Sequence, residues 1–421
     1  MKTNPQRLAA WRSRVFPAAW ILYAGYYICR KDVVPGGESA VSQFALTLAC
    51  FATTYAIGQM IGGVLADRFG PRRTALAGAG LSILCTCLLA WCARPQVVLA
   101  LQLGNGLGQG FGWPSLLKLL GSWFRSGERD RVLGWWSTSY ILGGLLATSL
   151  TAWLVVHTGV ASHRGFYPAY LVSSGVLLCA AIFFGRETSG LPSSGLIEED
   201  ASSRVRLRDA VRNLTANHEI RIISGAYFFL KMTRYTLLFW LPHYLTAGLG
   251  YSLRSAQHMA SYFELLGFLG PIATGYAVER WFADRRMALA AGMLFGLAFL
   301  CLLHPVLATN GWFAISVSLS LMGILIYGSD ILISGMAVLD AVPEEMHGRA
   351  SGLVNGIGSI GQIISPFLVT VFVSHLGWTW LFDLFVFLAI LAAAICALGA
   401  RRPDQTWQPN RSVLEPSDQS L

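Results

Sequence analysis

The feature that most constrains this chain is a set of long runs without Asp, Glu, Lys or Arg. These runs cover 74–93, 132–162, 165–185, 287–329 and 350–382. A helix needs about 20 mostly apolar residues to cross the hydrocarbon core of a bilayer. Because a helix satisfies its own backbone hydrogen bonds there, such runs predict membrane-spanning helices. The expected fold class is an all-α, multi-pass integral membrane protein.

Composition supports the same class and excludes others. The chain is 54% hydrophobic and 13% charged over 421 residues, whereas soluble domains carry about 25% charged residues. The net charge of +9 would suit a nucleic-acid binder, but the basic residues gather in short hydrophilic breaks, as in cytoplasmic loops of membrane proteins. We therefore expect a lipid bilayer and no nucleic acid as partner. The sequence contains no catalytic triad, metal-ligand spacing or phosphate-binding loop, so no enzyme activity, metal or cofactor is expected.

The apolar runs predict twelve transmembrane helices in two pseudo-symmetric groups of six. They cover 15–36, 42–66, 73–94, 96–122, 131–156, 166–186, 219–247, 256–279, 286–307, 311–338, 347–374 and 378–400. One long hydrophilic break divides the chain. We expect an N-terminal bundle at 1–186, a cytoplasmic linker at 187–218, a C-terminal bundle at 219–402 and a disordered tail at 403–421.

Basic residues fall unevenly on the two sides of these helices. They concentrate in the N-terminal segment, in the second-to-third and fourth-to-fifth connections, and in the central break, while the opposite connections contribute only Arg94, Arg164 and Arg254. The positive-inside rule therefore predicts that both termini are cytoplasmic. The bacterial inner membrane is the expected location, and a monomer the expected state. The basic amphipathic part of the central break is expected to lie on the membrane surface.

A charged motif recurs about half a chain apart. In the first copy Gly63 is followed by Asp67 and Arg68, with Arg72 and Arg73 downstream; in the second, Gly275 is followed by Glu279 and Arg280, with Arg285 and Arg286 downstream. Glycine allows helices to approach closely, and the acid can bridge to a neighbouring helix end or to an arginine. We expect these residues to control the separation of the two halves; plain charged loops are the alternative.

Two arginines lie inside apolar, aromatic runs. Arg30 ends the first predicted helix and Arg234 lies within the seventh, so one belongs to each half. A cation at the bilayer centre costs about 2.5–3.5 kcal/mol on insertion scales and usually faces a partner, a cavity or a substrate. A guanidinium matches phosphate oxygens bidentately. The two arginines predict a site for an anion between the halves. The alternative is structural pairing, of Arg30 with Asp32 or of either arginine with Glu264.

At this level the chain resembles the major facilitator superfamily, and 63–73 resembles its loop motif. The run Tyr26-Tyr27-Ile28-Cys29-Arg30-Lys31-Asp32 resembles the first-helix signature of the organophosphate:phosphate antiporter family. The run 105–114, which ends in Gln-Gly-Phe-Gly-Trp-Pro, is similar to its fourth helix, especially in glucose-6-phosphate transporters. Arg234, Tyr235, Trp240 and Pro242 are similar to its seventh helix. The resemblance implies exchange of a phosphorylated small molecule for inorganic phosphate, or sensing of an organophosphate.

Further side chains become candidates on the same resemblance. Tyr23 and Tyr327 match positions that line the family's cavity, and Trp136 and Tyr140 lie in a segment that resembles its cavity-lining fifth helix. Lys118 matches a basic position of the family's fourth helix, and Tyr23 and Tyr27 share the helical face of Arg30. For each of these aromatic residues, a place in the interfacial aromatic belt is the alternative. The resemblance also implies that Glu264 pairs with a cation when substrate is absent. For Lys31, Lys118 and Lys231, binding in the cavity and structural pairing both remain open. Asp330 matches no family position; pairing with Lys231 and carrying a proton both remain open.

Three departures leave the substrate undefined. Asp32 replaces a common asparagine, Phe239 a common aspartate, and Gln59 a second-helix lysine of glycerol-phosphate transporters. Three functions are consistent with the sequence: an organophosphate:phosphate antiporter, a sensor of the same fold, and a proton-coupled carrier of another organic anion that uses Asp32, Glu264 or Asp330.

Overall fold

The computed structural model describes residues 5–31, 40–91, 94–158, 168–188 and 207–400. The main helices are α1 (Pro5–Lys31), α2 (Ala40–Phe69), α3 (Pro71–Leu89), α4 (Pro95–Gly110), α5 (Gly112–Trp123), α6 (Ser126–Thr158), α7 (Pro168–Glu187), α8 (Leu207–Ala216), α9 (His218–His243), α10 (Leu253–Gly267), α11 (Leu269–Ala277), α12 (Arg286–Ala308), α13 (Trp312–Ile331), α14 (Ala337–Asp340), α15 (His347–Leu376) and α16 (Leu381–Ala400). Short π and 3₁₀ segments are η1 (Tyr244–Gly248), η2 (Val278–Phe282), η3 (Leu332–Met336), η4 (Glu344–Met346) and η5 (Trp378–Trp380). Each of the twelve predicted helices has a counterpart among the described residues. The predicted parts 32–36, 92–93 and 166–167 and the predicted tail 403–421 lie outside the described residues.

Several predicted helices are interrupted. The fourth is divided into α4 and α5 at Phe111, just before Pro114, which has no backbone N–H to continue the helical ladder. The eighth is divided into α10 and α11 beside Pro271, and the tenth contains the π-helical segment η3 directly after Asp330 and Ile331. The first begins ten residues before its predicted start, at Pro5. Interruptions of this kind often lie beside functional sites.

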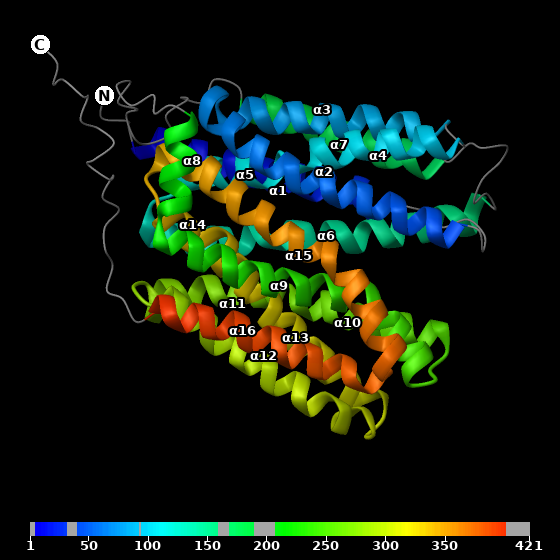
Figure 1. The fold of residues 1–421 in the computed structure, drawn as a ribbon. Coiled ribbons are helices and arrows are strands. Elements are labelled where there is room, and N and C mark those ends of the chain that lie inside the picture. Colours follow the sequence, from blue (N-terminus) through cyan, green and yellow to red (C-terminus); the bar gives the residue numbers. More distant parts are fainter. Residues whose placement is uncertain (1–4, 32–39, 92–93, 159–167, 189–206, 401–421) are drawn as a thin grey trace, which may run out of the picture.

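The helices form two groups that meet along their length (Figure 1). Helices α1–α7 pack on one another in the blue and cyan half, and α9–α16 pack in the green to red half. Contacts between the halves run mainly from α2 to α15 and from α6 to α11. The short helix α8 lies near the starts of α1 and α9, at the end of the molecule where the described N- and C-terminal helices also begin and finish.

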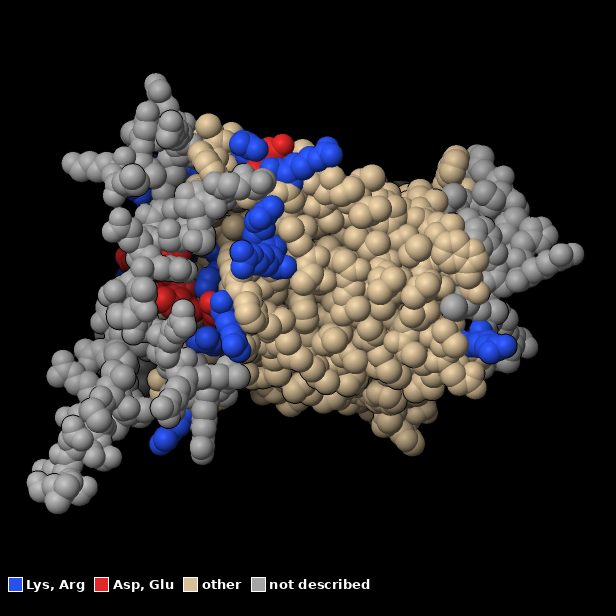
Figure 2. Space-filling view, turned by 90° about the horizontal axis from the view of Figure 1, so that it is seen from above, with Lys and Arg blue, Asp and Glu red and all other residues tan. Residues whose placement is uncertain are grey.

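A broad uncharged surface covers the middle of the molecule on the face that Figure 2 shows. In Figure 2 the visible surface is tan over most of its length, and Lys, Arg, Asp and Glu gather mainly at one end. Seven described helical segments are long and apolar enough to cross a membrane, among them 286–308 and 381–400. Other helices carry charge or are interrupted, as α9 does with Lys231 and Arg234. We call the end with the start of α1, the α2–α3 connection and α14 the charged end.

Candidate functional site: a cationic pocket between the two halves

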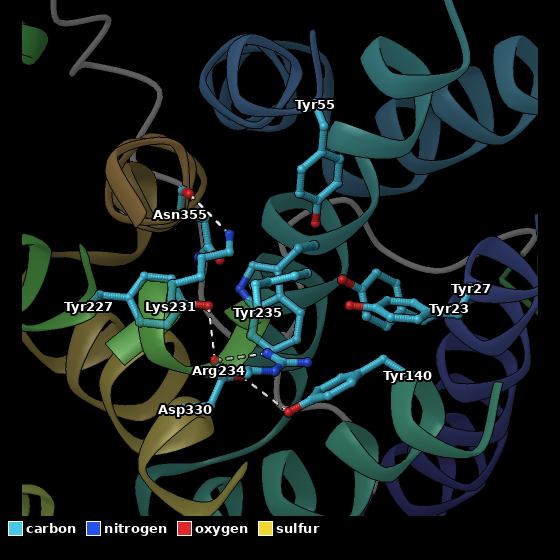
Figure 3. Close-up of a pocket in the computed structure, with 11 residues that line it drawn as sticks. Tyr23, Tyr27, Tyr55, Tyr140, Tyr227, Lys231, Arg234, Tyr235, Asp330 and Asn355 are labelled. Atoms are coloured by element: carbon cyan, nitrogen blue, oxygen red, sulfur yellow. Dashed lines mark hydrogen bonds and ion pairs between the residues drawn. The ribbon is translucent and has the colours of Figure 1, made fainter. Parts of the chain in front are cut away.

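A small pocket lies where the two halves meet, and Figure 3 shows side chains from both entering it. Its lining comprises Tyr23, Tyr27, Tyr55, Trp113 and Tyr140 from the first half, and Tyr227, Lys231, Arg234, Tyr235, Asp330 and Asn355 from the second. Within the part of the chain that the structure describes, the space between these side chains is large enough for roughly one water molecule. A molecule larger than water therefore fits only if the halves move apart.

Arg30, at the end of α1, is not one of the lining residues but packs against two of the lining tyrosines. Its guanidinium lies 4.2 Å from the ring centre of Tyr27 and 4.3 Å from that of Tyr55. The Nε atom donates a hydrogen bond of 2.9 Å to the Gln109 side chain. Its Nη2 atom is buried and has no hydrogen-bond partner among the described residues. An unsatisfied buried donor on a guanidinium is available for an anion.

Arg234 enters from α9 and is held differently. Its Nη1 atom lies 2.9 Å from the Asp330 carboxylate, and both side chains are almost fully buried. The same carboxylate accepts hydrogen bonds of 3.1 Å from Tyr140 and from Tyr227. The Arg234 guanidinium also packs 4.7 Å from the Tyr140 ring and 4.8 Å from the Tyr327 ring. Its Nε atom is buried without a hydrogen-bond partner in the described chain.

Of the two alternatives for Asp330, the structure does not show pairing with Lys231, because the carboxylate pairs with Arg234. That Asp330 carries a proton stays a prediction. Lys231 donates to the Ser359 hydroxyl at 2.7 Å and to the Asn355 carbonyl at 3.3 Å. Its ammonium also lies 5.3–5.9 Å from the ring centres of three pocket tyrosines. Lys231 and Arg234 share a face of α9 because they are three residues apart, so both α9 cations line the pocket.

Aromatic rings connect the cations across the pocket. The rings of Tyr27 and Tyr140 are 5.5 Å apart, with Arg30 against the first and Arg234 against the second. Tyr55 lies between Arg30 and Lys231 in the same way. Cation–π contacts stabilise such cations by about 2 kcal/mol or more when desolvated. Lys231 and Arg234 therefore line an aromatic pocket together with the Asp330 carboxylate, and Arg30 packs against two of its tyrosines.

The predicted aromatic residues divide into lining and support. Tyr23, Tyr27 and Tyr140 line the pocket. Trp136 lies behind it, donates to the Ala19 carbonyl at 3.3 Å and packs against Tyr23 and Trp113. Tyr327 lies behind Tyr140 and packs against Phe263. Trp136 and Tyr327 thus fix the rings and the arginine that face the pocket.

Lys118 is not in the pocket, so the structural-pairing alternative applies to it. Its ammonium lies 2.8 Å from the Asp67 carboxylate at the charged end. Trp113 of the same helix lines the pocket, and five further helical residues advance the chain by about 7.5 Å. That displacement carries Lys118 to the predicted loop motif.

The first copy of the motif closes the charged end tightly. Asp67 accepts hydrogen bonds of 2.9 Å from the backbone N–H groups of Gly348 and Arg349, at the start of α15. A carboxylate there satisfies free helical N–H groups and complements the helix dipole. A Cβ atom on Gly63 would lie 2.2 Å from the Gly348 carbonyl oxygen. Glycine therefore allows α2 and α15 to meet at the backbone.

The second copy of the motif makes looser contacts at the charged end than the first copy does. Glu279 lies 3.4 Å from Arg131 of α6, and Arg131 is 43% exposed. A Cβ atom on Gly275 would lie 2.7 Å from the Asp130 carbonyl oxygen, so α11 also approaches α6 closely. Arg286, downstream in this copy, bonds Asp130 at 2.7 Å and also pairs with Asp340. Arg129 of α6 pairs with Asp340 as well.

The remaining predicted charges have varied places. Arg72 donates to the Gly185 carbonyl at 2.8 Å and to Thr188 at 3.1 Å, which fastens α3 to the end of α7. Arg68, Arg73 and Arg280 are exposed. Glu264 is half-buried and interacts electrostatically with Tyr327; its pairing with a cation stays a prediction. Lys31 ends α1, and its side chain is not described; Asp32 lies outside the described residues.

Sequence reasoning missed several pocket residues, namely Tyr55, Trp113, Tyr227, Tyr235 and Asn355. A signal existed for two of them: Tyr227 and Tyr235 lie four residues before and after Lys231, so they share its helical face. No comparable pattern marks Tyr55 or Asn355, because α2 and α15 reach the pocket only through packing across the halves. No cluster of three or more His, Cys, Asp or Glu side chains in the described ranges could hold a metal ion.

Comparison with known families identifies the class. The profile of the Major Facilitator Superfamily matches residues 18–329 and 223–417. The chain therefore belongs to the Major Facilitator Superfamily and is a multi-pass integral membrane protein of the twelve-helix fold, which confirms the expected fold class.

Three relatives show which family within the superfamily the chain is similar to. The chain is 27% identical to a glycerol-3-phosphate transporter of Bacillus subtilis over 92% of both chains. It is 26% identical to sugar phosphate exchanger 3 of Gallus gallus, over 85% of this chain and 79% of that one. It is 24% identical to the membrane sensor protein UhpC of Escherichia coli, over 93% and 92%. The predicted resemblance to the organophosphate:phosphate antiporter family is confirmed.

Solved structures show the same fold. The Escherichia coli fucose:proton symporter superimposes with a TM-score of 0.75 at 14% identity, over 92% of this chain and 98% of that one. The human organic anion transporter MFSD10 superimposes with a TM-score of 0.74 at 15% identity, over 94% and 100%. These similarities establish the arrangement of the helices.

Proposed function

We propose that this protein is a secondary active transporter that exchanges a phosphorylated small organic molecule for inorganic phosphate. The observation that carries the proposal is the buried Nη2 of Arg30, which has no hydrogen-bond partner among the described residues and belongs to a guanidinium packed on Tyr27 and Tyr55 of the pocket that Arg234 and Lys231 line. Relatives named as a glycerol-3-phosphate transporter and a sugar phosphate exchanger support the same chemistry.

The charge of the pocket suits a phosphate group. Lys231 and Arg234 in the lining, and Arg30 against two lining tyrosines, contribute three positive charges, and Asp330 removes one. A phosphate monoester carries about −1.5 to −2 charge at neutral pH. It would therefore leave the site close to neutral, which a low-dielectric interior requires. Six tyrosines around these cations offer hydroxyl donors to phosphate and ring faces to an organic group.

Transport follows from the position of the pocket between two bundles, 1–186 and 219–402, joined by the linker 187–218. Phosphate bound by Arg30 of one half and Arg234 of the other would replace contacts that hold the halves together. The halves then rock about the occupied site and open it to the opposite side, as in other transporters with sites between repeats. In the described conformation Asp67 and Glu279 hold the charged end together.

The orientation follows from charge. Basic side chains gather at the charged end, so that end faces the cytoplasm and both termini with it, in a bacterial inner membrane. The protein acts as a monomer in the lipid bilayer, because the residues of one chain line the whole site.

Uptake of radiolabelled phosphate into proteoliposomes loaded with phosphate tests the proposal. We expect uptake that requires internal phosphate and that glycerol-3-phosphate or glucose-6-phosphate inhibits or replaces. Correctly folded protein that shows no exchange with any of these compounds would refute it.

A sensor is the second candidate, and the similarity to UhpC is the observation that favours it. The same pocket would then bind an organophosphate without efficient transport. Phosphate binding to purified protein, together with exchange below a few per cent of that of an authentic antiporter, would select the sensor.

A further inference from the structure

The second α9 cation is connected to the opposite half through a chain of buried side chains. Lys231 donates to the Ser359 hydroxyl at 2.7 Å, and that hydroxyl lies 2.8 Å from the Gln59 side-chain oxygen on α2. All three side chains are at most 2% exposed. The serine belongs to α15 and the glutamine to α2, so this link crosses between the halves at the pocket.

The chemistry of the three side chains decides which group donates and which accepts each hydrogen bond. An ammonium only donates, so the Ser359 oxygen must accept from Lys231. The serine proton is then free to bond Gln59 or the Asn355 carbonyl, which lies 3.0 Å away. The charge on Lys231 therefore orders the hydroxyl that contacts the other half. Charge-assisted bonds of this kind are about twice as strong as neutral ones.

Close packing on one side holds the link in place. A Cβ atom on Gly352 would lie 2.4 Å from the Gln59 carbonyl oxygen, and one on Gly356 would lie 2.6 Å from the Met60 side chain. The backbones of α2 and α15 thus meet between the charged end and the pocket. Gln59 and Ser359 lie at the end of this close contact that is next to Lys231.

A matching link lies on the other side of the pocket. There Arg234 pairs with Asp330 of its own half, and Asp330 accepts a hydrogen bond from Tyr140 of α6. Each α9 cation therefore binds a polar side chain of its own half that in turn bonds the opposite half. Both cations also line the pocket that an anion would enter.

We infer that Lys231, Ser359 and Gln59 form a latch that holds the empty carrier closed and makes exchange obligatory. Phosphate in the pocket draws the Lys231 ammonium away from Ser359, and the link to Gln59 weakens. Without phosphate the latch persists, and the empty carrier returns slowly. Ser359 and Gln59 are positioning residues here. The inference rests on the proposed exchange of phosphate, which the experiment measures separately.

The test compares net efflux with exchange. Proteoliposomes loaded with labelled phosphate are diluted into buffer without phosphate, for net efflux, or with phosphate, for exchange. We expect Ser359→Ala to raise the ratio of net efflux to exchange at least about tenfold, with Gln59→Leu acting in the same direction. The control is Ser365→Ala, because Ser365 is a buried serine of α15 that bonds the Gln362 carbonyl of its own helix. This control should keep the wild-type ratio within about twofold.

A second measurement needs no transport. With the eight native cysteines replaced, spin labels at Arg73 and Ala283, both exposed at the charged end, report the separation of the halves in phosphate-free protein. Ser359→Ala should broaden the distance distribution toward longer values, and Ser365→Ala should not. If wild type fails to exchange phosphate, the proposed function falls while this measurement still tests the latch. Unchanged distances and an unchanged efflux ratio in both folded latch variants would overturn the inference.

Discussion

Arg30 and Arg234 approach one pocket from opposite halves, but their surroundings differ. Arg30 packs between two tyrosine rings, bonds one glutamine and keeps a buried donor without a partner in the described chain. Arg234 is paired with Asp330, whose carboxylate two tyrosines also bind. One arginine is available to an anion at once; the other must first share or exchange its carboxylate.

This difference suggests a division of roles. Arg30 would make the first contact with an entering phosphate, since no protein carboxylate competes for it in the described residues. Arg234 would join when phosphate displaces Asp330, and the link from Asp330 to Tyr140 would loosen at that step. Binding and the release of contact between the halves would then be one event.

The largest effect is expected when Arg234 is removed and Asp330 remains. Arg234→Gln leaves a buried carboxylate facing the anion, so phosphate exchange should fall at least about 100-fold, from the lost charge-assisted bonds and the added repulsion. The double variant Arg234→Gln with Asp330→Asn should exchange phosphate about tenfold faster than Arg234→Gln alone in proteoliposomes. A double variant no more active than Arg234→Gln would show that Asp330 does not oppose the substrate.

Asp330→Asn alone should lower the thermal stability of the protein and raise its affinity for phosphate. Breaking a buried ion pair costs up to about 3–5 kcal/mol, so the melting temperature should fall. Phosphate should bind about tenfold more tightly, because the competing carboxylate is gone, and should restore much of the lost thermal stability. Thermal unfolding with and without phosphate measures both effects, and unchanged or weaker phosphate binding would contradict the account.

Removing the third cation should have an intermediate effect. Lys231→Met keeps the length of the side chain and removes its charge, so the affinity for phosphate should fall about tenfold, equivalent to about 1.4 kcal/mol. Phosphate-dependent exchange over a range of concentrations provides the measurement. An unchanged KM would place Lys231 outside the anion's reach.

Lys118→Met is the matched control and should have the smallest effect on binding. Lys118 bonds Asp67 at the charged end rather than lining the pocket, so the affinity for phosphate should change less than about twofold. Its maximal exchange rate is free to change, because the Asp67 contacts close that end. A loss of affinity equal to that of Lys231→Met would contradict the assignment of Lys118.

Much of this fold could be predicted from the sequence, because membrane-spanning helices carry their signal locally. Arg30 and Arg234 could be found in the same way, as charges in apolar runs. The pairing of Arg234 with Asp330 could not, since the partners lie 96 positions apart on different helices. The position of Lys118 outside the pocket could not be predicted either, because it depends on how far α5 continues beyond the break at Phe111. The link between Gln59 and Ser359 depends on glycine packing between α2 and α15, which no local pattern reports.

The central claim is that one phosphate is bound by Arg30 and Arg234 together, and direct binding tests it most closely. Isothermal titration of purified protein with phosphate would compare wild type, Arg30→Lys, Arg234→Lys and the control Arg221→Lys, whose arginine is exposed near the start of α9. The account predicts that the control binds as wild type does. Each pocket variant should lose about 10- to 100-fold in affinity, because lysine cannot replace the guanidinium fork. Wild-type affinity in folded Arg30→Lys protein would contradict the account.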